Sequence, residues 1–229
     1  MSISQIFHDM VEIFSKYYIG QGLLWTAIGY TLLLSAIAVF FGALLGSVMA
    51  IGKMSGIKPV SFLITAIVEV LRGTPMLLQL YIAYFILPML LGTSGLSAFA
   101  CVAVGLSLNS GAYVSEIIRS GIEAVDKGQT EAARALGLTP STTMLKIVLP
   151  QAIKNILPAL GNEFVTIIKE TSLASTFFVG ELMTTYSIIK GITFNAIPTL
   201  MDIGIIYFVI TFTLSKLMGV LERRMKQSA

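Results

Sequence analysis

Five ionisable side chains lie in or beside long apolar stretches of this chain: Glu69, Arg72, Glu163, Lys169 and Glu170. A charge inside a membrane costs at least about 2.5–3.5 kcal/mol on insertion scales, so each such residue suggests a function. Side chains of these types bind charged ligands or pair with one another. The chain has one histidine, His8, and one cysteine, Cys101, so we expect no metal site and no internal disulfide.

Glu163 is the most specific of these residues. It lies nine residues past Lys154, which is roughly 13 Å along a helix and near the middle of a ~30 Å hydrocarbon layer. It has no basic neighbour three or four residues away, and the polar Asn162 is adjacent. Such a carboxylate suits an ammonium or another cationic group; the alternative is a hydrogen bond between helices. Gln79 and Asn109 are weaker candidates for the same site, because polar residues commonly join membrane helices.

Glu69 and Arg72 are three residues apart, so on a helix they can neutralise one another. The sequence Gly73, Thr74, Pro75 follows directly. Pro75 disfavours helix at Thr74 and lacks a backbone donor, so we predict a break or kink here. The pair is either a buried scaffold ion pair or part of a gate that changes shape.

Composition indicates the elements that position these residues. Of 229 residues, 55% are hydrophobic and only 12% are charged, and residues 23–52 and 73–115 contain no Asp, Glu, Lys or Arg. Runs longer than ~18 apolar residues predict transmembrane helices, which satisfy their own backbone polar groups. We predict an all-α transmembrane protein with a turn at 92–95. Its five spans cover about 22–51, 60–91, 96–118, 152–175 and 198–219.

The placement of basic residues predicts the orientation, because Lys and Arg favour the cytoplasmic side. One side of the membrane would hold the loop between the third and fourth spans and the C-terminus. The basic residues on this side are Lys53, Lys58, Arg119, Lys127, Arg134, Lys146, Lys154, Arg223, Arg224 and Lys226. The other side has Lys16 and Lys190. We therefore expect an external leader over 1–21, with an interfacial helix at about 3–18, a transmembrane domain over 22–220 and a cytoplasmic basic tail over 221–229. Lys169 and Glu170 then line an outer vestibule or pair with headgroups.

A polar insert, EAARALGLTPSTTMLKIVLP, occupies residues 131–150 of this apolar chain. Good helix formers predict a helix over 129–136 that ends at Gly137 in a left-handed conformation. Thr139 fits an N-cap with Pro140 after it, and a second short helix should run to about Leu149 and stop at Pro150. The insert could be an ordinary connector or a helix-turn-helix. The length of the insert argues against an ordinary connector, because loops longer than about 12–15 residues are usually functional. Its few basic side chains argue against a DNA-binding helix-turn-helix, which must face phosphates.

The spacing within this insert resembles the EAA loop of ABC importer permeases. The matching residues are Glu131, Ala132, Ala133, Gly137, Ile147, Leu149 and Pro150. The stretches EVLRGTPMLLQLY at 69–81 and NSGAYVSEIIRSGIEAVDKGQTEAA at 109–133 narrow the resemblance to polar amino-acid uptake permeases. The resemblance covers nearly the whole chain.

The resemblance implies a five-span type I ABC importer permease in the bacterial cytoplasmic membrane. Its coupling helices, over about 120–150, would dock on a separate ATPase with Arg134 on the docking surface. Since the sequence has no G-x-x-x-x-G-K-[ST] phosphate loop, ATP and Mg²⁺ would be bound by the ATPase, and this chain is expected to be neither an enzyme nor a cofactor carrier.

The expected partners are two ATPase subunits, a second permease copy or a homologous permease, an extracytoplasmic substrate-binding protein, the amino-acid substrate and the lipid membrane. No nucleic acid is expected. Asn162, Glu163, Gln79 and Asn109 are the candidate substrate pathway. Two alternatives remain open: an ion-gradient-driven secondary transporter, although we find no internal repeat, and a scaffold or sensor that transports nothing.

Overall fold

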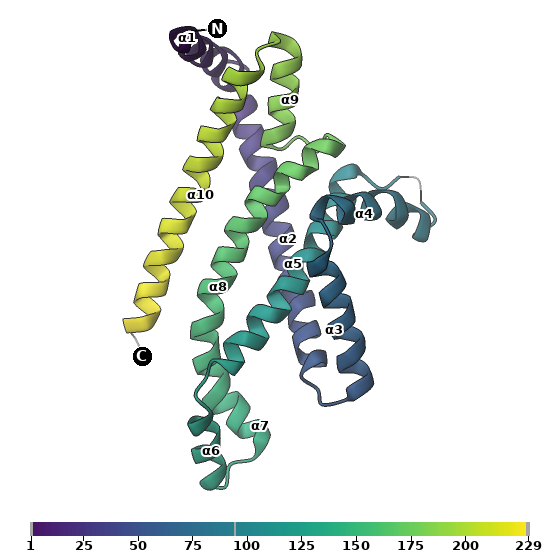
Figure 1. The fold of residues 1–229 in the computed structure, drawn as a ribbon, viewed down its shortest axis with the longest axis vertical. Coiled ribbons are helices and arrows are strands. Elements are labelled where there is room, and N and C mark those ends of the chain that lie inside the picture. The colour runs from purple at the N-terminus through teal and green to yellow at the C-terminus, as the bar shows by residue number, and fades with distance from the viewer. Residues whose placement is uncertain (1, 94, 228–229) are drawn as a thin grey trace. The chain divides into compact units, whose positions relative to one another are not determined.

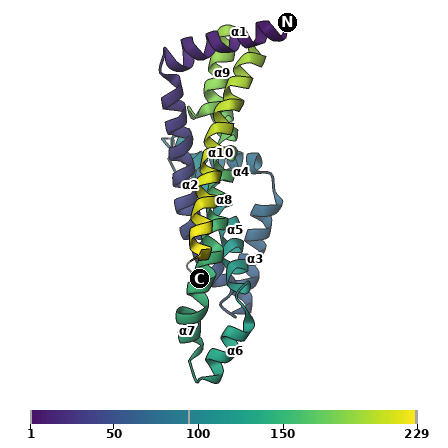
Figure 2. The ribbon, with the colours of Figure 1, turned by 90° about the vertical axis from the view of Figure 1, so that its left-hand side faces the viewer.

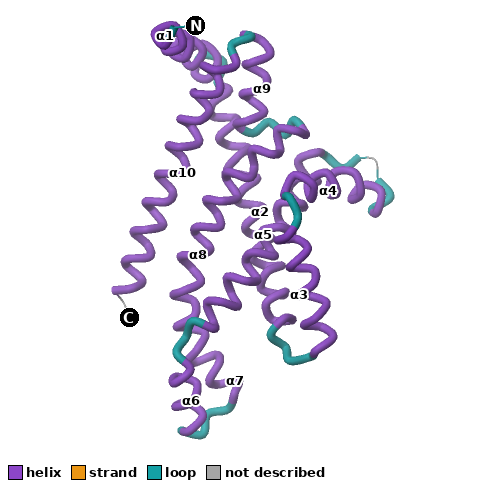
Figure 3. The backbone as a smooth tube through the Cα atoms, viewed as in Figure 1, coloured by secondary structure: helices purple, strands orange, loops and turns teal. Residues whose placement is uncertain are grey.

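The structure, a computed structural model, describes residues 2–93 and 95–227, and the secondary structure in this part of the chain is helical (Figures 1 and 3). Ser228, Ala229 and the side chains of Lys226 and Gln227 lie outside the description, so this part of the predicted basic tail stays a prediction. In chain order the elements are α1 (Ile3–Ile13), η1 (Phe14–Ile19), α2 (Leu23–Lys53), α3 (Lys58–Gly73), α4 (Met76–Leu90), α5 (Ala98–Glu123), α6 (Lys127–Ala135), α7 (Pro140–Thr143), η2 (Met144–Val148), α8 (Leu149–Glu170), η3 (Thr171–Phe177), α9 (Leu182–Thr193) and α10 (Ala196–Gln227).

Among the described residues, three single helices are long and apolar enough to cross a membrane: α2, α5 and α10. The pair α3 and α4 counts as a fourth candidate if it is taken as one broken span. The predicted break is confirmed, because α3 ends at Gly73 and the backbone is extended at Thr74 (φ −110°, ψ 149°) and Pro75 (φ −60°, ψ 134°). The fourth predicted span corresponds to α8, which does not meet the same length and composition criterion.

Contacts divide the chain into two compact units, and the long helices α2, α5, α8 and α10 each contribute to both. The first unit consists of Met1–Ala38, Pro75–Leu106 and Val165–Leu214; the second consists of Val39–Thr74, Ser107–Phe164 and Ser215–Ala229.

The core of the first unit joins the leader to segments from the other end of the chain. Its buried members are Ile13, Tyr18, Ala27, Leu182, Ile189, Ile203 and Ile206. The predicted leader helix is present as α1 followed by the π-helical turn η1 (Figure 2). Because Ile13 and Tyr18 are buried in this core, the leader packs on protein as well as presenting exposed apolar residues such as Phe7.

Small residues bring α2 and α5 together in the second unit. A Cβ added to Gly42 would lie 2.7 Å from the Cβ of Ser110, and one added to Gly46 would lie 2.7 Å from the carbonyl oxygen of Gly111. Backbones this close need glycine at the contact, as is common in membrane helix pairs. A smaller apolar cluster, Val125, Val148, Ala152 and Ile156, holds the start of α8 against the end of α5.

Candidate functional site

The coupling segment, defined here as residues 126–150, begins with a well-capped helix. The side chain of Asp126 accepts a hydrogen bond of 2.6 Å from the Gly128 amide at the start of α6. At the other end Gly137 has φ +81°, the Leu138 amide donates to the carbonyl of Ala133, and the Gly137 amide donates to that of Arg134. These two bonds form a Schellman motif, which confirms the predicted left-handed C-cap.

The second predicted cap is also confirmed, but the predicted stop is wrong. The Thr139 hydroxyl accepts a hydrogen bond of 3.2 Å from the Thr142 amide, and Pro140 is the first residue of α7. The chain then continues through the π-helical turn η2 into α8, which starts at Leu149. Pro150 therefore lies inside a continuous helical run, directly after the wider π-helical turn η2, which accommodates a residue without an amide donor.

Most of the predicted coupling residues face outward. Glu131, Ala132, Arg134, Gly137 and Pro150 are exposed, Ile147 and Leu149 are half-buried, and Ala133 is buried. Arg134 donates a hydrogen bond of 2.5 Å to the Leu138 carbonyl, and no ion pair between Arg134 and Glu131 is present among the described residues. Between α5, α6 and η2 lies a hollow of about 770 Å³, lined by Glu123, Lys127, Arg134, Thr143, Met144 and Val148 among others.

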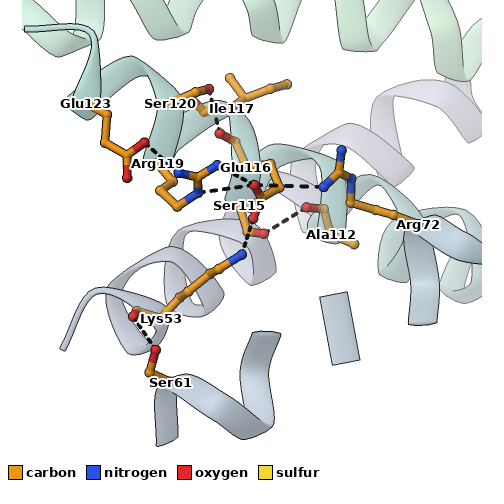
Figure 4. Close-up of polar contacts among 10 residues, drawn as sticks. All are labelled: Lys53, Ser61, Arg72, Ala112, Ser115, Glu116, Ile117, Arg119, Ser120 and Glu123. Atoms are coloured by element: carbon orange, nitrogen blue, oxygen red, sulfur yellow. Dashed lines mark hydrogen bonds and ion pairs between the residues drawn. The ribbon is translucent and has the colours of Figure 1, made fainter. Parts of the chain in front are cut away.

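A charged cluster that the sequence did not predict lies at the end of α5. We define the Glu116 cluster as Lys53, Arg72, Glu116 and Arg119 (Figure 4). Lys53, the last residue of α2, binds Oε1 of Glu116. The Arg119 guanidinium donates twice to Oε2 at 2.9 and 3.1 Å, and Arg72 lies 3.8 Å from the same oxygen.

Arg72 corrects one prediction from the sequence. It pairs with Glu116 and lies over the Tyr113 ring, 5.4 Å from the centroid, while Glu69 is exposed and has no ion pair with Arg72 in the part of the chain that is described. The predicted ion pair between Glu69 and Arg72 is therefore wrong. Two side chains of α5 provide Arg72 with a partly buried carboxylate and an aromatic ring instead. Arg119 also bonds Glu123 at 2.5 Å on the exposed side of α5.

The predicted substrate-pathway residues are divided between the two units. Glu163 is buried at 8% exposure and Asn109 at 7%, both in the second unit, where Asn162 is exposed. Asn109 donates to the Leu71 carbonyl at 3.5 Å and so contacts α3. Gln79, at 8% exposure, belongs to the first unit.

Lys169 and Glu170 end α8, with Lys169 exposed and Glu170 half-buried. The helix α9 and its N-cap residue, Glu181, follow them and were not predicted from the sequence. This fully buried carboxylate accepts from the amides of Met183 (2.6 Å) and Thr184 (2.7 Å) and from the Tyr207 hydroxyl (3.1 Å). Burial raises the pKa of Glu181 above its ordinary value, although these donors oppose the shift.

One signal in the sequence points to part of the Glu116 cluster. Glu116 and Arg119 are three apart at the end of a charge-free run, which is the spacing of a helical ion pair. No local pattern joins them to Lys53 or Arg72, which come from other helices. Within the described residues no group of three or more His, Cys, Asp or Glu side chains could hold a metal ion.

A family model decides the class of this protein. Residues 42–227 match the family described as binding-protein-dependent transport system inner membrane component. The chain belongs to this family. It is therefore a multi-pass membrane permease component of an ABC transport system rather than a catalytic subunit.

Curated relatives of the permease cover most of its length. The arginine transport system permease protein ArtQ of Bacillus subtilis (strain 168) is 41% identical over 86% of this chain and 90% of its own. The L-cystine transport system permease protein TcyB of the same organism is 38% identical over 86% of this chain and 83% of its own. The putative glutamine transport system permease protein GlnP of Rickettsia conorii is 38% identical over 96% of this chain and 99% of its own.

Solved structures agree with this assignment. A chain in the crystal structure of an amino acid ABC transporter with histidines is 43% identical, with a TM-score of 0.86 over 93% of this permease and 98% of that chain. A chain of the MetNI methionine ABC transporter in an inward-facing conformation has a TM-score of 0.74 over 89% of this permease and 96% of that chain, at 18% identity. The second similarity shows the fold alone.

Proposed function

We propose that this permease forms, with a second permease copy or a homologous permease, the membrane pathway of an ATP-driven importer of polar amino acids. A separate ATPase, present in two copies, would bind ATP and Mg²⁺ and dock on the coupling segment. An extracytoplasmic binding protein would deliver the substrate. The family assignment and the amino-acid permeases among the relatives support this proposal.

The observation that carries the proposal is the folded form of the coupling segment. Its helix α6 is capped at both ends, and the turn at Gly137 is fixed by the Schellman motif and by the bond from Arg134. Leu136, at this turn, is a large apolar residue that remains 83% exposed. A rigid, outward-facing segment with small residues at Ala132 and Gly137 suits close docking of a partner, because little conformational freedom is lost on binding.

In this proposal the chain crosses the membrane five times, with α8 as the fourth span and the broken pair α3–α4 as the second. The leader lies outside, and the coupling segment and the basic tail lie in the cytoplasm, as the distribution of Lys and Arg predicts. The second copy would pack around a two-fold axis. The polar character of α8 fits a helix that lines the pathway and does not face lipid on all sides.

Transport would then depend on how tightly ATP and the loaded binding protein bind the inward-open and the outward-open state. ATP closes the ATPase pair and moves the coupling segments, and the spans change from inward-open to outward-open. The loaded binding protein and ATP must both bind the outward-open state more tightly, because only such a difference shifts the population. Glu163 is proposed to meet the positive group of the amino acid within the membrane, with Asn162, Gln79 and Asn109 as further polar residues of the pathway.

The test is reconstitution of the permease in liposomes with its ATPase and binding protein. We expect loaded binding protein to stimulate ATP hydrolysis and uptake together. An ion-gradient-driven transporter would take up substrate without ATP, and a scaffold would take up none. Failure of the loaded binding protein to stimulate hydrolysis overturns the proposal.

A further inference from the structure

We propose that Glu116 is a positioning residue for transport, which fixes the last turn of α3 to α5 through Arg72 so that this turn moves with the coupling segment. This inference rests on the proposed function, because it assumes that the ATPase moves that segment. It assigns a role in transport to a cluster that lies outside both the coupling segment and the candidate substrate pathway.

The contacts of Glu116 place its carboxylate among three cations. Its side chain is 16% exposed and faces cations from α2, α3 and α5 (Figure 4). Lys53 occupies Oε1, while Arg119 and Arg72 share Oε2. Neutralising this one carboxylate would leave three cations close together, and these cations would repel one another.

A stripe on one face of α5 holds the last turn of α3. Asn109, Tyr113 and Glu116 are spaced by four and three residues, which places them on the same side of a helix. Asn109 contacts the Leu71 carbonyl, and Tyr113 and Glu116 both contact Arg72. The end of α3 is thus fastened to α5 at three successive positions.

The chain on either side of these contacts explains what the fastening does. The helix α5 continues to Glu123, and Asp126 then caps α6, so the coupling segment follows the stripe with only a short turn between them. Beyond Arg72 the helix ends at Gly73, and the backbone becomes extended at Thr74 and Pro75. Because α5 is a continuous helix, a movement of the coupling segment can be transmitted along it to the end of α3. The extended backbone at Thr74 and Pro75 then allows the end of α3 to move without moving α4 as part of the same rigid body.

The sharpest variant is Arg72→Gln, because it removes the link between Glu116 and α3 and leaves Lys53 and Arg119 to neutralise Glu116. Arg72 is 41% exposed and lies 3.8 Å from its partner, so we expect the assembled complex to remain folded. In proteoliposomes with ATPase and binding protein, we expect the amino acid imported per ATP hydrolysed to fall by about tenfold, a typical size for coupling between sites. Co-purification of the ATPase should stay unchanged.

Two controls accompany this variant. Lys58→Gln removes the same charge from the exposed start of α3 and should keep the ratio of uptake to hydrolysis within about twofold of wild type. Arg72→Lys restores a cation that can face both Glu116 and Tyr113, so it should recover most of the lost ratio. A merely structural loss would lower the melting temperature and the yield of complex without this pattern of rescue.

The outcomes separate this inference from the function on which it rests. If wild-type complex shows no stimulation by loaded binding protein, the proposed importer itself is wrong. If wild type is stimulated and Arg72→Gln keeps the wild-type ratio, the role of Glu116 is wrong and the importer stands. Should Arg72→Gln fail to assemble, Arg72→Met removes the charge that faces Glu116 while keeping an unbranched apolar stem beside Tyr113; an unchanged ratio there also overturns the inference.

Discussion

Lys53 and Glu116 come from the end of α2 and from α5, and their ion pair joins two helices whose backbones already touch at Gly42 and Gly46. The small residues set the distance between the helices, and the ion pair lies nearer their ends. Both side chains are 16% exposed, so the pair is screened less than one on a free surface. Packing and charge therefore act together at this contact.

Glu116→Gln should destabilise the protein more than Glu123→Gln. The first change leaves three cations facing an uncharged side chain, which we expect to cost about 3 kcal/mol. The second removes one bond of a carboxylate that is 58% exposed, at about 0.5 kcal/mol. Thermal melts of the two variants in one detergent make the comparison, and equal melting temperatures would contradict the view of Glu116 as the centre of the cluster.

Gly46→Val should weaken the contact of α2 with α5. A Cβ at this position would lie 2.7 Å from the Gly111 carbonyl oxygen, so the backbones must separate, at about 1–3 kcal/mol. Gly29→Ala is the matched control in the same helix, since an added Cβ there meets nothing within 4 Å and alanine favours helix. A melting temperature for Gly46→Val at or above that of wild type would be inconsistent with this packing.

Glu131→Lys should weaken docking of the ATPase by about tenfold or more, because reversing an interfacial charge turns attraction into repulsion. Glu131 is exposed on α6, so the membrane fold should be intact. Co-purification of the ATPase from detergent and uptake in liposomes are the measurements. Normal values of both together would refute a role for this residue in coupling.

Glu163→Gln should raise the KM for amino acids with a positive side chain by about tenfold, since a hydrogen bond to a charged group contributes about 1.5–3 kcal/mol. Uncharged amino acids should be affected less. Uptake kinetics for a panel of substrates provide the test. Unchanged kinetics for every substrate would instead favour a role for Glu163 in joining helices.

Glu181→Gln should flatten the dependence of stability on pH. A carboxyl whose pKa is raised in the folded state contributes stability that is complete below its ordinary pKa of 4.5 and is lost as pH rises through the folded pKa. Wild type should therefore lose stability above about pH 4.5, while Glu181→Gln should lose less. Melts across this range, with Glu131→Gln as an exposed control, measure the effect; parallel curves for wild type and Glu181→Gln would exclude it.

Local features were predicted from the sequence where a few neighbouring residues determine them. Gly137, Thr139 and Pro140 set the turn between α6 and α7, and Pro75 sets the break after α3, because glycine and proline restrict the backbone whatever surrounds them. The stop predicted at Pro150 was wrong, because a proline inside a helix can be accommodated by a local kink or π-helical turn, and η2 lies directly before it.

Features that depend on distant segments could not be predicted. Arg72 has an acidic neighbour three residues before it, yet its partner is Glu116 on another helix. Glu181 caps α9 in a buried network that requires Tyr207 from α10, and no pattern around residue 181 predicts that hydroxyl. Charge periodicity identifies possible pairs, whereas the packing of the helices decides between them.

The core that joins Ile13, Tyr18 and Ala27 to Leu182, Ile189 and Ile203 sets an order of events during biosynthesis. Chains emerge from the ribosome starting at the N-terminus, so the leader and the first half of α2 are made long before the residues that bury them. Until α9 and the start of α10 follow, Ile13, Tyr18 and Ala27 lack the residues that bury them in this core. The first unit is therefore begun first and completed near the end of synthesis.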